Sequence, residues 1–302
     1  MFKRKNFDLH LPTRTLALGK RTLLMGVLNI TPDSFSDGGK FLTADRAMDH
    51  ALTLQKSGAD ILDIGAESTR PGSKDTSAVE ELRRLLPVLQ SLRGKLKIPI
   101  SIDTRKASVA EIALSAGAEI VNDVSGLHYD PRLAEVAARR RVPLILTHMR
   151  GEPATMQKIP FARNVMHDVT KGLRASIQKA RNAGVAKSQI IIDPGIGFGK
   201  SFQQNYELLQ SLPQLAKLGY PLLVGTSRKG FLGRTLALAQ QGRARTKTKT
   251  VPPDQRIWAT AATVTASILG GAHIVRIHDV VEMAQVARIA DLLLNPRDIS
   301  EK

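Results

Sequence analysis

The sequence contains no cysteine and few aromatic residues. Without cysteine the chain can form no disulfide, no thiolate zinc site and no cysteine nucleophile, so its chemistry must use oxygen and nitrogen side chains or a hard metal ion. Aromatic residues make up 4% of the chain and are not interleaved with basic residues, which leaves few platforms for stacking single-stranded nucleic acid. A small-molecule ligand is therefore favoured.

The chain also lacks a recognisable targeting or membrane-spanning segment. The basic residues 3–5 are not followed by an apolar run long enough for the core of a signal peptide. Residues 257–275 carry no charged side chain and approach the length of a bilayer span, but they are mostly Ala and Thr and contain His273 and a Gly pair. We predict a buried helix and strand there, and a cytoplasmic protein without membrane contact.

Positive charge is in clear excess, with a formal net charge of +17. A basic surface attracts phosphate whatever the sequence, so nucleic acid is one candidate partner. Three of the basic residues lie in a short N-terminal tail, however, and four lie in residues 241–253, for which we predict a flexible surface loop. The remaining charge is spread without a run, so we expect an anionic small substrate and no nucleic acid.

Short runs of Val, Ile and Leu alternate with amphipathic segments along a chain of 302 residues. This alternation predicts buried parallel strands in βα units. We count about eight such strands, which is the number that a single (β/α)8 TIM barrel over residues 1–302 requires. The predicted strands are 23–29, 60–65, 99–103, 119–123, 143–148, 190–193, 221–225 and 272–277, and the clearest helices are 44–57, 79–92, 107–116 and 165–183.

Polar residues stand at or just after the end of each predicted strand. Since a barrel collects its strand carboxyl ends on one face, these side chains predict a polar bowl at that face. Buried polar groups cost free energy unless they are paired, so a purely structural barrel would not need so many. The residues are Asn29, Asp63, Asp103, Asn122, Asp123, His148, Asp193, Ser227 to Lys229, Arg276 and His278.

Several strand ends suit an anionic ligand. Arg276 and His278 are two residues apart on a strand and point to the same face, although surface salt bridges would explain them too. The Asn29 carboxamide suits a hard metal ion, and Arg70 on a Pro-Gly loop can reach a phosphate. Around Asp103 and Asn122, capping of the next helix is as good an explanation as a ligand contact.

Residues 193–201 resemble a nucleotide-binding P-loop at first sight. Pro194 stands where that motif needs its first glycine, so nucleotide hydrolysis is not expected. The spaced glycines permit a tight turn that presents Asp193 and Phe198 to a planar ligand. In that arrangement, the carboxylate would accept hydrogen bonds from amine and ring N–H groups.

Taken in order, these motifs resemble the dihydropteroate synthase family from about residue 23 to residue 294. The strings are NITPDSFSDGG, STRPGS, IDT, NDVSG, THMRGEPATMQ, DPGIGFGK, SRKGF and RIHD. The resemblance implies a folate-pathway transferase of the sulfonamide-target class. Such an enzyme condenses 6-hydroxymethyl-7,8-dihydropterin diphosphate with p-aminobenzoate, with Mg²⁺ present, to give 7,8-dihydropteroate and diphosphate.

The resemblance also assigns roles to residues at matching motif positions. It implies a catalytic set that holds charge and uses no side-chain nucleophile: Asp103, Asp193, Lys229, Arg276 and His278. The implied pterin site is Asp103, Asn122, Met149, Asp193, Gly225 and Lys229. The implied diphosphate site is Asn29, Arg70, Arg276 and His278, with Asn29 on the metal. The implied p-aminobenzoate pocket is Phe35, Thr69, Pro71, Phe198, Lys229 and Gly230.

One departure and two alternatives accompany this interpretation. Gly230 stands where many relatives carry Ser, so a backbone N–H at a helix start would have to replace a hydroxyl contact. A methyltetrahydrofolate-binding methyltransferase barrel would share the pterin pocket but would not need a diphosphate clamp. A basic nucleic-acid-binding barrel would not need polar strand ends. We expect a homodimer.

Overall fold

The computed structural model describes residues 4–30, 40–69, 72–73, 75–156, 158–241 and 250–298. Eight parallel strands form one sheet in the order β8-β7-β6-β5-β4-β3-β10-β9. A parallel bridge between Ile192 and Leu222 joins the two edge strands and closes the barrel. The strands are β3 (Leu23–Asn29), β4 (Ile61–Gly65), β5 (Ile100–Asp103), β6 (Ile120–Asp123), β7 (Leu144–Thr147), β8 (Ile190–Asp193), β9 (Leu223–Val224) and β10 (Ile274–Ile277).

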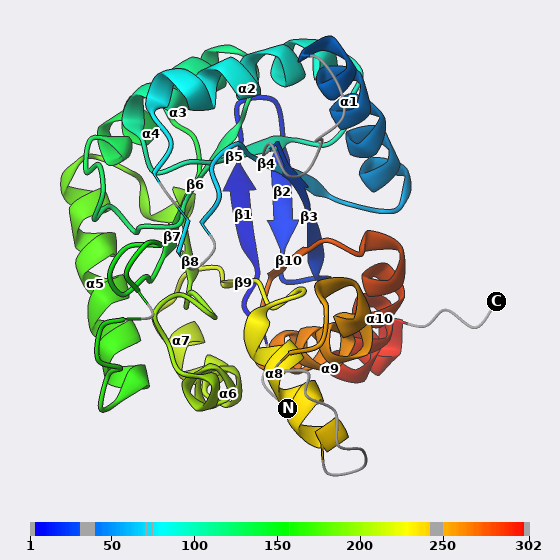
Figure 1. Ribbon diagram of the computed structural model, residues 1–302. Coiled ribbons are helices and arrows are strands. Elements are labelled where there is room, and N and C mark those ends of the chain that lie inside the picture. Colours follow the sequence, from blue (N-terminus) through cyan, green and yellow to red (C-terminus); the bar gives the residue numbers. More distant parts are fainter. Residues whose placement is uncertain are drawn as a thin grey trace.

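Helices surround the barrel on the outside, as Figure 1 shows. The (β/α)8 prediction is confirmed, and the predicted strands differ from the observed ones only at their ends. Residues 257–275, considered as a membrane span, form a helix and part of a strand. The helices are α1 (Lys40–Lys56), α2 (Ala78–Leu92), α3 (Ala107–Ser115), α4 (Leu133–Arg140), α5 (Val165–Asn182), α6 (Phe202–Gln210), α7 (Leu212–Ala216), α8 (Gly230–Gln241), α9 (Ile257–Leu269) and α10 (Val280–Leu294).

The barrel interior consists of an apolar layer and a polar layer. Because successive side chains on a strand point to opposite faces, inward positions recur every second residue. The apolar layer is a separate core cluster that includes Leu23, Met25, Ile61, Ile120, Ile145, Ile191, Leu223 and Ile274. Two residues beyond four of these, at the carboxyl ends of the strands, stand Asp63, Asn122, Asp193 and Arg276. The alternation thus places the polar groups inside the barrel mouth.

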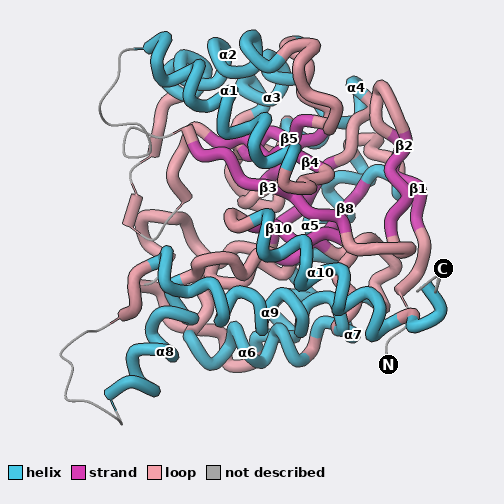
Figure 2. Tube along the Cα trace, turned by 90° about the vertical axis from the view of Figure 1, so that its right-hand side faces the viewer, coloured by secondary structure: helices cyan, strands magenta, loops and turns pink. Residues whose placement is uncertain are grey.

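An antiparallel hairpin closes the opposite end of the barrel. It consists of β1 (Phe7–His10) and β2 (Thr15–Leu18), and it lies at one end of the strand bundle in Figure 2. Its buried side chains Leu9, Leu11 and Leu18 belong to the same cluster as the apolar layer. The sequence patterns did not predict this hairpin. It shields the base of the core from water and leaves the mouth as the accessible end.

Arg4, which the sequence analysis placed in a short basic N-terminal tail, is packed against the barrel. Its guanidinium is buried, donates to Thr22 Oγ1 at 2.7 Å and to the Ala272 carbonyl at 3.0 Å, and pairs with Asp291 Oδ1 at 2.5 Å. A buried arginine needs such partners, and Asp291 on α10 supplies the charge. The predicted flexible loop falls largely outside the described residues, since 242–249 are not among them.

None of the helices in these described ranges is long and apolar enough to cross a membrane.

Candidate active site

A cluster of carboxylates surrounds Arg276 at the barrel mouth. The guanidinium Nε donates to Asp63 Oδ2 at 2.6 Å, and Nη2 donates to Asp103 Oδ2 at 2.7 Å. Asn122 Nδ2 donates to the same Asp63 oxygen at 3.1 Å. These residues come from β4, β5, β6 and β10, so four strand ends meet in one hydrogen-bonded cluster.

Strand register explains why the cluster is tight. Gly65 pairs with Asn29 on one side and with Asp103 on the other. A Cβ at Gly65 would lie 3.3 Å from the Cβ of Asp103, which is closer than most such contacts. The missing side chain therefore leaves room for the Asp103 carboxyl beside the half-buried Asn29.

Burial changes the protonation of this cluster. It raises the pKa of the Asp103 carboxyl to about 7, although Arg276 acts to lower it. The pKa of Arg276 is raised, because the carboxylates of Asp63 and Asp103 outweigh the opposite effect of burial. Asp63 Oδ1 is buried without a hydrogen-bond partner in the described part of the chain. The cluster thus holds poorly hydrated charge, which interacts strongly with a charged or polar ligand.

A second cluster forms on the glycine-rich turn after β8. Asp193 Oδ1 accepts from the Gly195 amide at 2.7 Å, and the Lys229 ammonium donates to the Ile196 carbonyl. Lys229 Nζ also lies 4.8 Å from the centre of the Phe198 ring. The turn therefore places Lys229 beside Phe198 and near Asp193, the two residues that the sequence analysis expected to face a planar ligand.

The glycines are required for this turn. Gly195 has a φ of +66°, and a Cβ there would lie 1.9 Å from the His148 carbonyl oxygen. A side chain at this position would both strain the backbone and push the β7 and β8 ends apart. The close approach of these two strands fixes where Asp193 points.

Lys229 and Asp193 only partly offset the effect of burial on each other's pKa. Burial lowers the pKa of Lys229 to about 8, although Asp193 acts to raise it. Burial also raises the pKa of Asp193, against the effect of Lys229. Both groups therefore lie nearer to neutrality than exposed side chains of the same kind, and a ligand can change their protonation.

The remaining predicted residues that the structure describes lie around the same mouth. His278 is held separately from the carboxylate cluster: its backbone N–H donates to Ser227 Oγ at 3.1 Å, and its Nδ1 lies 3.0 Å from the same hydroxyl. Met149 is buried just after β7, and Gly225 directly follows β9. Thr69 is half-buried on the loop after β4, and Gly230 is exposed at the start of α8. Phe35, Arg70 and Pro71 lie outside the described residues.

Sequence reasoning missed the roles of two buried groups. Asp63 was noted as a strand-end residue without a function, yet it binds both Arg276 and Asn122. The signal was its position two residues after the inward Ile61. Lys200, which is 2% exposed, donates to the His148 carbonyl at 2.8 Å and lies 3.0 Å from His148 Nδ1. Nothing in the sequence pairs these two residues.

A hollow of about 620 Å³ lies elsewhere, beside the hairpin at the base of the barrel. Its lining comes from β2, the segment before β5 and α10, and it contains none of the strand-end residues. In (β/α)8 enzymes, chemistry is performed at the carboxyl ends of the strands. We therefore place the active site at the mouth and not in this hollow.

No group of three or more His, Asp or Glu side chains that could hold a metal ion lies in the part of the chain that the structure describes.

The fold and the site together define a class of protein. A closed (β/α)8 barrel whose mouth carries Arg276, Lys229 and buried carboxylates is built to bind a polar, charged small molecule.

Comparison with known proteins gives the family. The family model of pterin binding enzymes matches residues 25–278. The dihydropteroate synthase of Synechocystis is 48% identical over 91% of each chain, and that of Bacillus subtilis is 43% identical over 95% of this chain and 94% of the relative. The chain therefore belongs to the dihydropteroate synthases within the pterin-binding enzyme family.

Solved structures agree. A dihydropteroate synthase from Clostridium difficile, solved in the presence of pteroic acid, has a TM-score of 0.83 at 43% identity and covers 91% of this chain and 98% of that chain. The Yersinia pestis enzyme with a sulfonamide drug complex has a TM-score of 0.85 at 39% identity, covering 95% and 99%. These relatives favour a synthase over the methyltetrahydrofolate-binding alternative.

Proposed function

We propose that this chain condenses 6-hydroxymethyl-7,8-dihydropterin diphosphate with p-aminobenzoate to give 7,8-dihydropteroate and diphosphate. The observation that carries the proposal is the polar layer at the barrel mouth, in which Arg276 and Lys229 lie against buried carboxylates. Relatives whose structures contain 4-aminobenzoic acid or 7,8-dihydropteroate share the fold at TM-scores of 0.85 and 0.81.

The pterin binds between the two clusters. Its amine and ring N–H groups donate to the carboxylates of Asp193 and Asp103, and Asn122 supplies a carboxamide whose Nδ2 already binds Asp63. Met149 and Gly225 line the same mouth, where a small or apolar surface accepts a ring face. Burial makes these hydrogen bonds selective, because a ligand that left a buried carboxylate unpaired would bind poorly.

The diphosphate binds at the ends of β3 and β10, against Asn29, Arg276 and His278. Within the described residues, no hydrogen bond uses Nη1 of Arg276, so this nitrogen can donate to a phosphate oxygen while the other two hold the carboxylates. Asn29 would bind Mg²⁺ through its carboxamide oxygen, and the ion would neutralise charge on the departing diphosphate.

The chemistry needs no side-chain nucleophile. The aromatic amine attacks the pterin methylene, the bond from that carbon to the diphosphate oxygen breaks, and the amine loses a proton. The electron-rich pterin stabilises positive charge as the bond breaks, and Asp103 and Asp193 lie where they favour that charge. Phe198, Lys229, Thr69 and the amide end of α8 at Gly230 line the p-aminobenzoate side.

We further propose that the protein acts in the cytoplasm as a homodimer. The absence of cysteine fits a reducing compartment. Exposed apolar residues on α10 offer a surface for a second copy, as argued below.

Diphosphate release tests the reaction. The purified protein is mixed with the pterin diphosphate, p-aminobenzoate and Mg²⁺, and free diphosphate is measured with each substrate left out in turn. Release that requires both substrates is the expected result. No release above background in the complete mixture would contradict the proposed function.

A further inference from the structure

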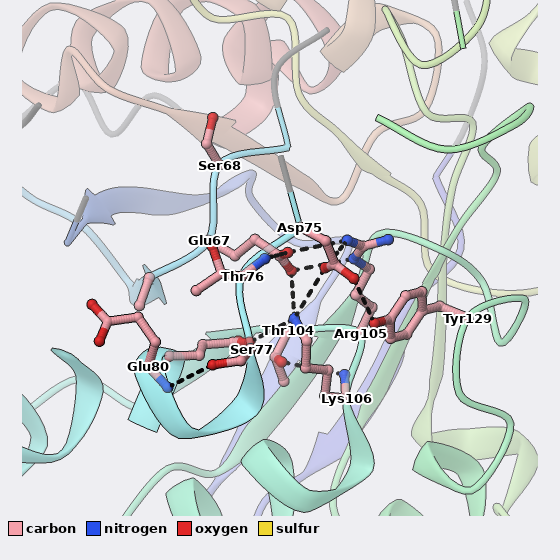
Figure 3. A network of polar contacts seen from close by, with 12 residues as sticks. Glu67, Ser68, Asp75, Thr76, Ser77, Glu80, Thr104, Arg105, Lys106 and Tyr129 are labelled. Carbon is pink, nitrogen blue, oxygen red and sulfur yellow. Dashed lines mark hydrogen bonds and ion pairs between the residues drawn. The ribbon is translucent and has the colours of Figure 1, made fainter. Parts of the chain in front are cut away.

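A buried ion network joins three loops at the barrel mouth, and the reaction described above does not use it. The loops follow β4, β5 and β6, and they contribute Glu67 and Asp75, Arg105 and Lys106, and Tyr129 respectively (Figure 3). The side chains of Glu67, Arg105 and Lys106 are 3%, 6% and 8% exposed. Three full charges are thus held almost out of water.

Two cations hold the carboxylates together. Arg105 donates to Glu67 Oε1 at 3.0 Å and to Asp75 Oδ1 at 2.6 Å. Lys106 donates to Glu67 Oε2 at 2.8 Å and to Glu81 on α2 at 2.9 Å. The pKa of Glu67 is lowered to about 2, because its hydrogen bonds outweigh the opposite effect of burial. Glu67 therefore stays ionised at neutral pH, and the network stays intact.

Both ends of the loop after β4 are fastened to this pair of cations. Glu67 lies at its start, two residues before Thr69, and its Oε1 also accepts from the backbone N–H of Thr76 at 2.9 Å. Asp75 lies at its end, where it accepts from the Tyr129 hydroxyl at 2.9 Å. The Tyr129 ring in turn covers Arg105, whose Cζ lies 4.1 Å from the ring centre.

Such a network is a costly way to gain stability. Replacing a buried ion pair by well-packed apolar residues is often neutral or stabilising, because the pair must overcome the desolvation of both charges. What the charges provide here is a fixed position for Glu67 and Asp75, near the two ends of a loop that begins at the active site. Arg105 also follows Asp103 by two residues, so the network continues directly from the carboxylate cluster.

We propose that Glu67 and Arg105 are positioning residues that hold the loop after β4, and with it Thr69, in place for p-aminobenzoate. The inference rests on the proposed function. Pterin contacts come from strand ends that the barrel itself holds, whereas the p-aminobenzoate side depends on this loop. Loosening the network should therefore weaken the binding of p-aminobenzoate and leave the binding of the pterin unchanged.

Two variants test the network at different strengths. Glu67→Gln turns one acceptor oxygen into a donor, which then faces Arg105 together with either the Thr76 amide or Lys106. Tyr129→Phe removes only the hydroxyl that holds Asp75 and keeps the ring over Arg105. Glu111→Gln is the control, because Glu111 on α3 pairs with Arg139 and Arg140 outside the network.

Calorimetry measures the affinity for p-aminobenzoate in the presence of diphosphate and Mg²⁺, and separately the affinity for 6-hydroxymethylpterin. Steady-state assays give KM for each substrate and kcat. We expect p-aminobenzoate affinity to fall about tenfold in Glu67→Gln and about threefold in Tyr129→Phe, because affinity falls with the fraction of correctly placed loop. Pterin affinity and kcat should stay within about twofold, and Glu111→Gln should behave as wild type.

The inference is overturned if both variants bind p-aminobenzoate like wild type, or if all affinities and kcat fall together as they would after general unfolding. If Glu67→Gln does not fold, Tyr129→Phe decides between these outcomes. Wild-type protein separates the two proposals. Its failure to release diphosphate would refute the proposed function, whereas active wild type with unaffected variants would refute this inference alone.

Discussion

The ionisable side chains of the active site are buried at the barrel mouth and are therefore poorly hydrated. Asp103 and Asp193 are 8% and 6% exposed; Arg276 is the nearby cation for Asp103, and Lys229 has the largest effect among the cations near Asp193. In such surroundings a protonation change alters ligand binding more than it would at an exposed site. The chemistry at this scale can therefore be examined one ionisable group at a time.

The pH dependence of pterin binding should report Asp103. Its pKa is raised to about 7, so in the free protein the carboxyl is increasingly protonated below pH 7 and loses its capacity to accept two hydrogen bonds. Affinity for 6-hydroxymethylpterin should therefore rise with pH from about 5, reach half of its increase near 7 and level at about 8. Calorimetric titrations across this range measure the rise, and it should be absent in Asp103→Asn. A slope that survives in this variant would assign the effect to another group.

Asp193→Asn should nearly abolish pterin affinity while leaving the fold intact. The carboxamide keeps one acceptor for the Gly195 amide but presents a donor to the donors of the pterin. We expect a loss of at least about a hundredfold, equivalent to about 2.7 kcal/mol. Titration and thermal melting are measured together, with Asp8→Asn on the exposed side of β1 as control. Unchanged affinity at an unchanged melting temperature would remove Asp193 from the pterin site.

Among the elements, the hairpin β1–β2 and the glycine turn after β8 shape the barrel at opposite ends. The turn brings Asp193 to Lys229, and the hairpin covers the apolar layer below them. Because the hairpin lies at the opposite end of the barrel from the strand ends, a defect there should cost stability without moving the mouth.

Leu9→Ala should lower the free energy of unfolding by about 2 to 5 kcal/mol, because Leu9 is fully buried and its loss leaves a cavity. Urea unfolding measures the change, and KM for both substrates should be unaltered. Val79→Ala on α2, where the side chain is 79% exposed, is the control and should cost less than about 0.5 kcal/mol. A large change in KM at Leu9→Ala would mean that the base and the mouth are coupled.

Sequence patterns predicted the elements unevenly, and the reasons are physical. The barrel strands are buried on both faces, so their continuous Ile, Val and Leu runs are easily recognised. The hairpin strands have exposed polar positions between few leucines, and they follow a basic segment that resembled a tail. Arg4 was assigned to the tail because its partner Asp291 is distant in the sequence.

The candidate site residues were also predicted only in part. Motif positions at strand ends, such as Asp103, Asp193 and Arg276, were predictable because the barrel collects those ends. Their pairing was not, because only the register of neighbouring strands places Asp63 between Arg276 and Asn122. The Glu67 network was also missed, since it depends on loops that meet only in the folded chain.

The whole molecule presents one surface that the barrel does not explain. On α10, Val281, Ile289 and Leu293 are 53%, 61% and 48% exposed. Ile289 and Leu293 are four residues apart and therefore neighbours on one helix face, Val281 lies two turns before Ile289, and Trp258 on α9, the helix that packs beside α10, is 82% exposed. Exposed apolar side chains that gather on one face mark an interface with another protein.

A second copy of the chain is the occupant that we predict for this face. Wild-type protein should therefore run as a dimer in size-exclusion chromatography with light scattering, and Ile289→Asp should shift it toward the monomer, because a dimer would bury an unpaired carboxylate. Val79→Asp is the matched control, since Val79 is equally apolar and 79% exposed but lies on α2. Diphosphate release per chain should persist in the monomer, as the residues of both clusters belong to one barrel. A wild-type monomer at micromolar concentration, or a dimer unaffected by Ile289→Asp, would contradict assembly through α10.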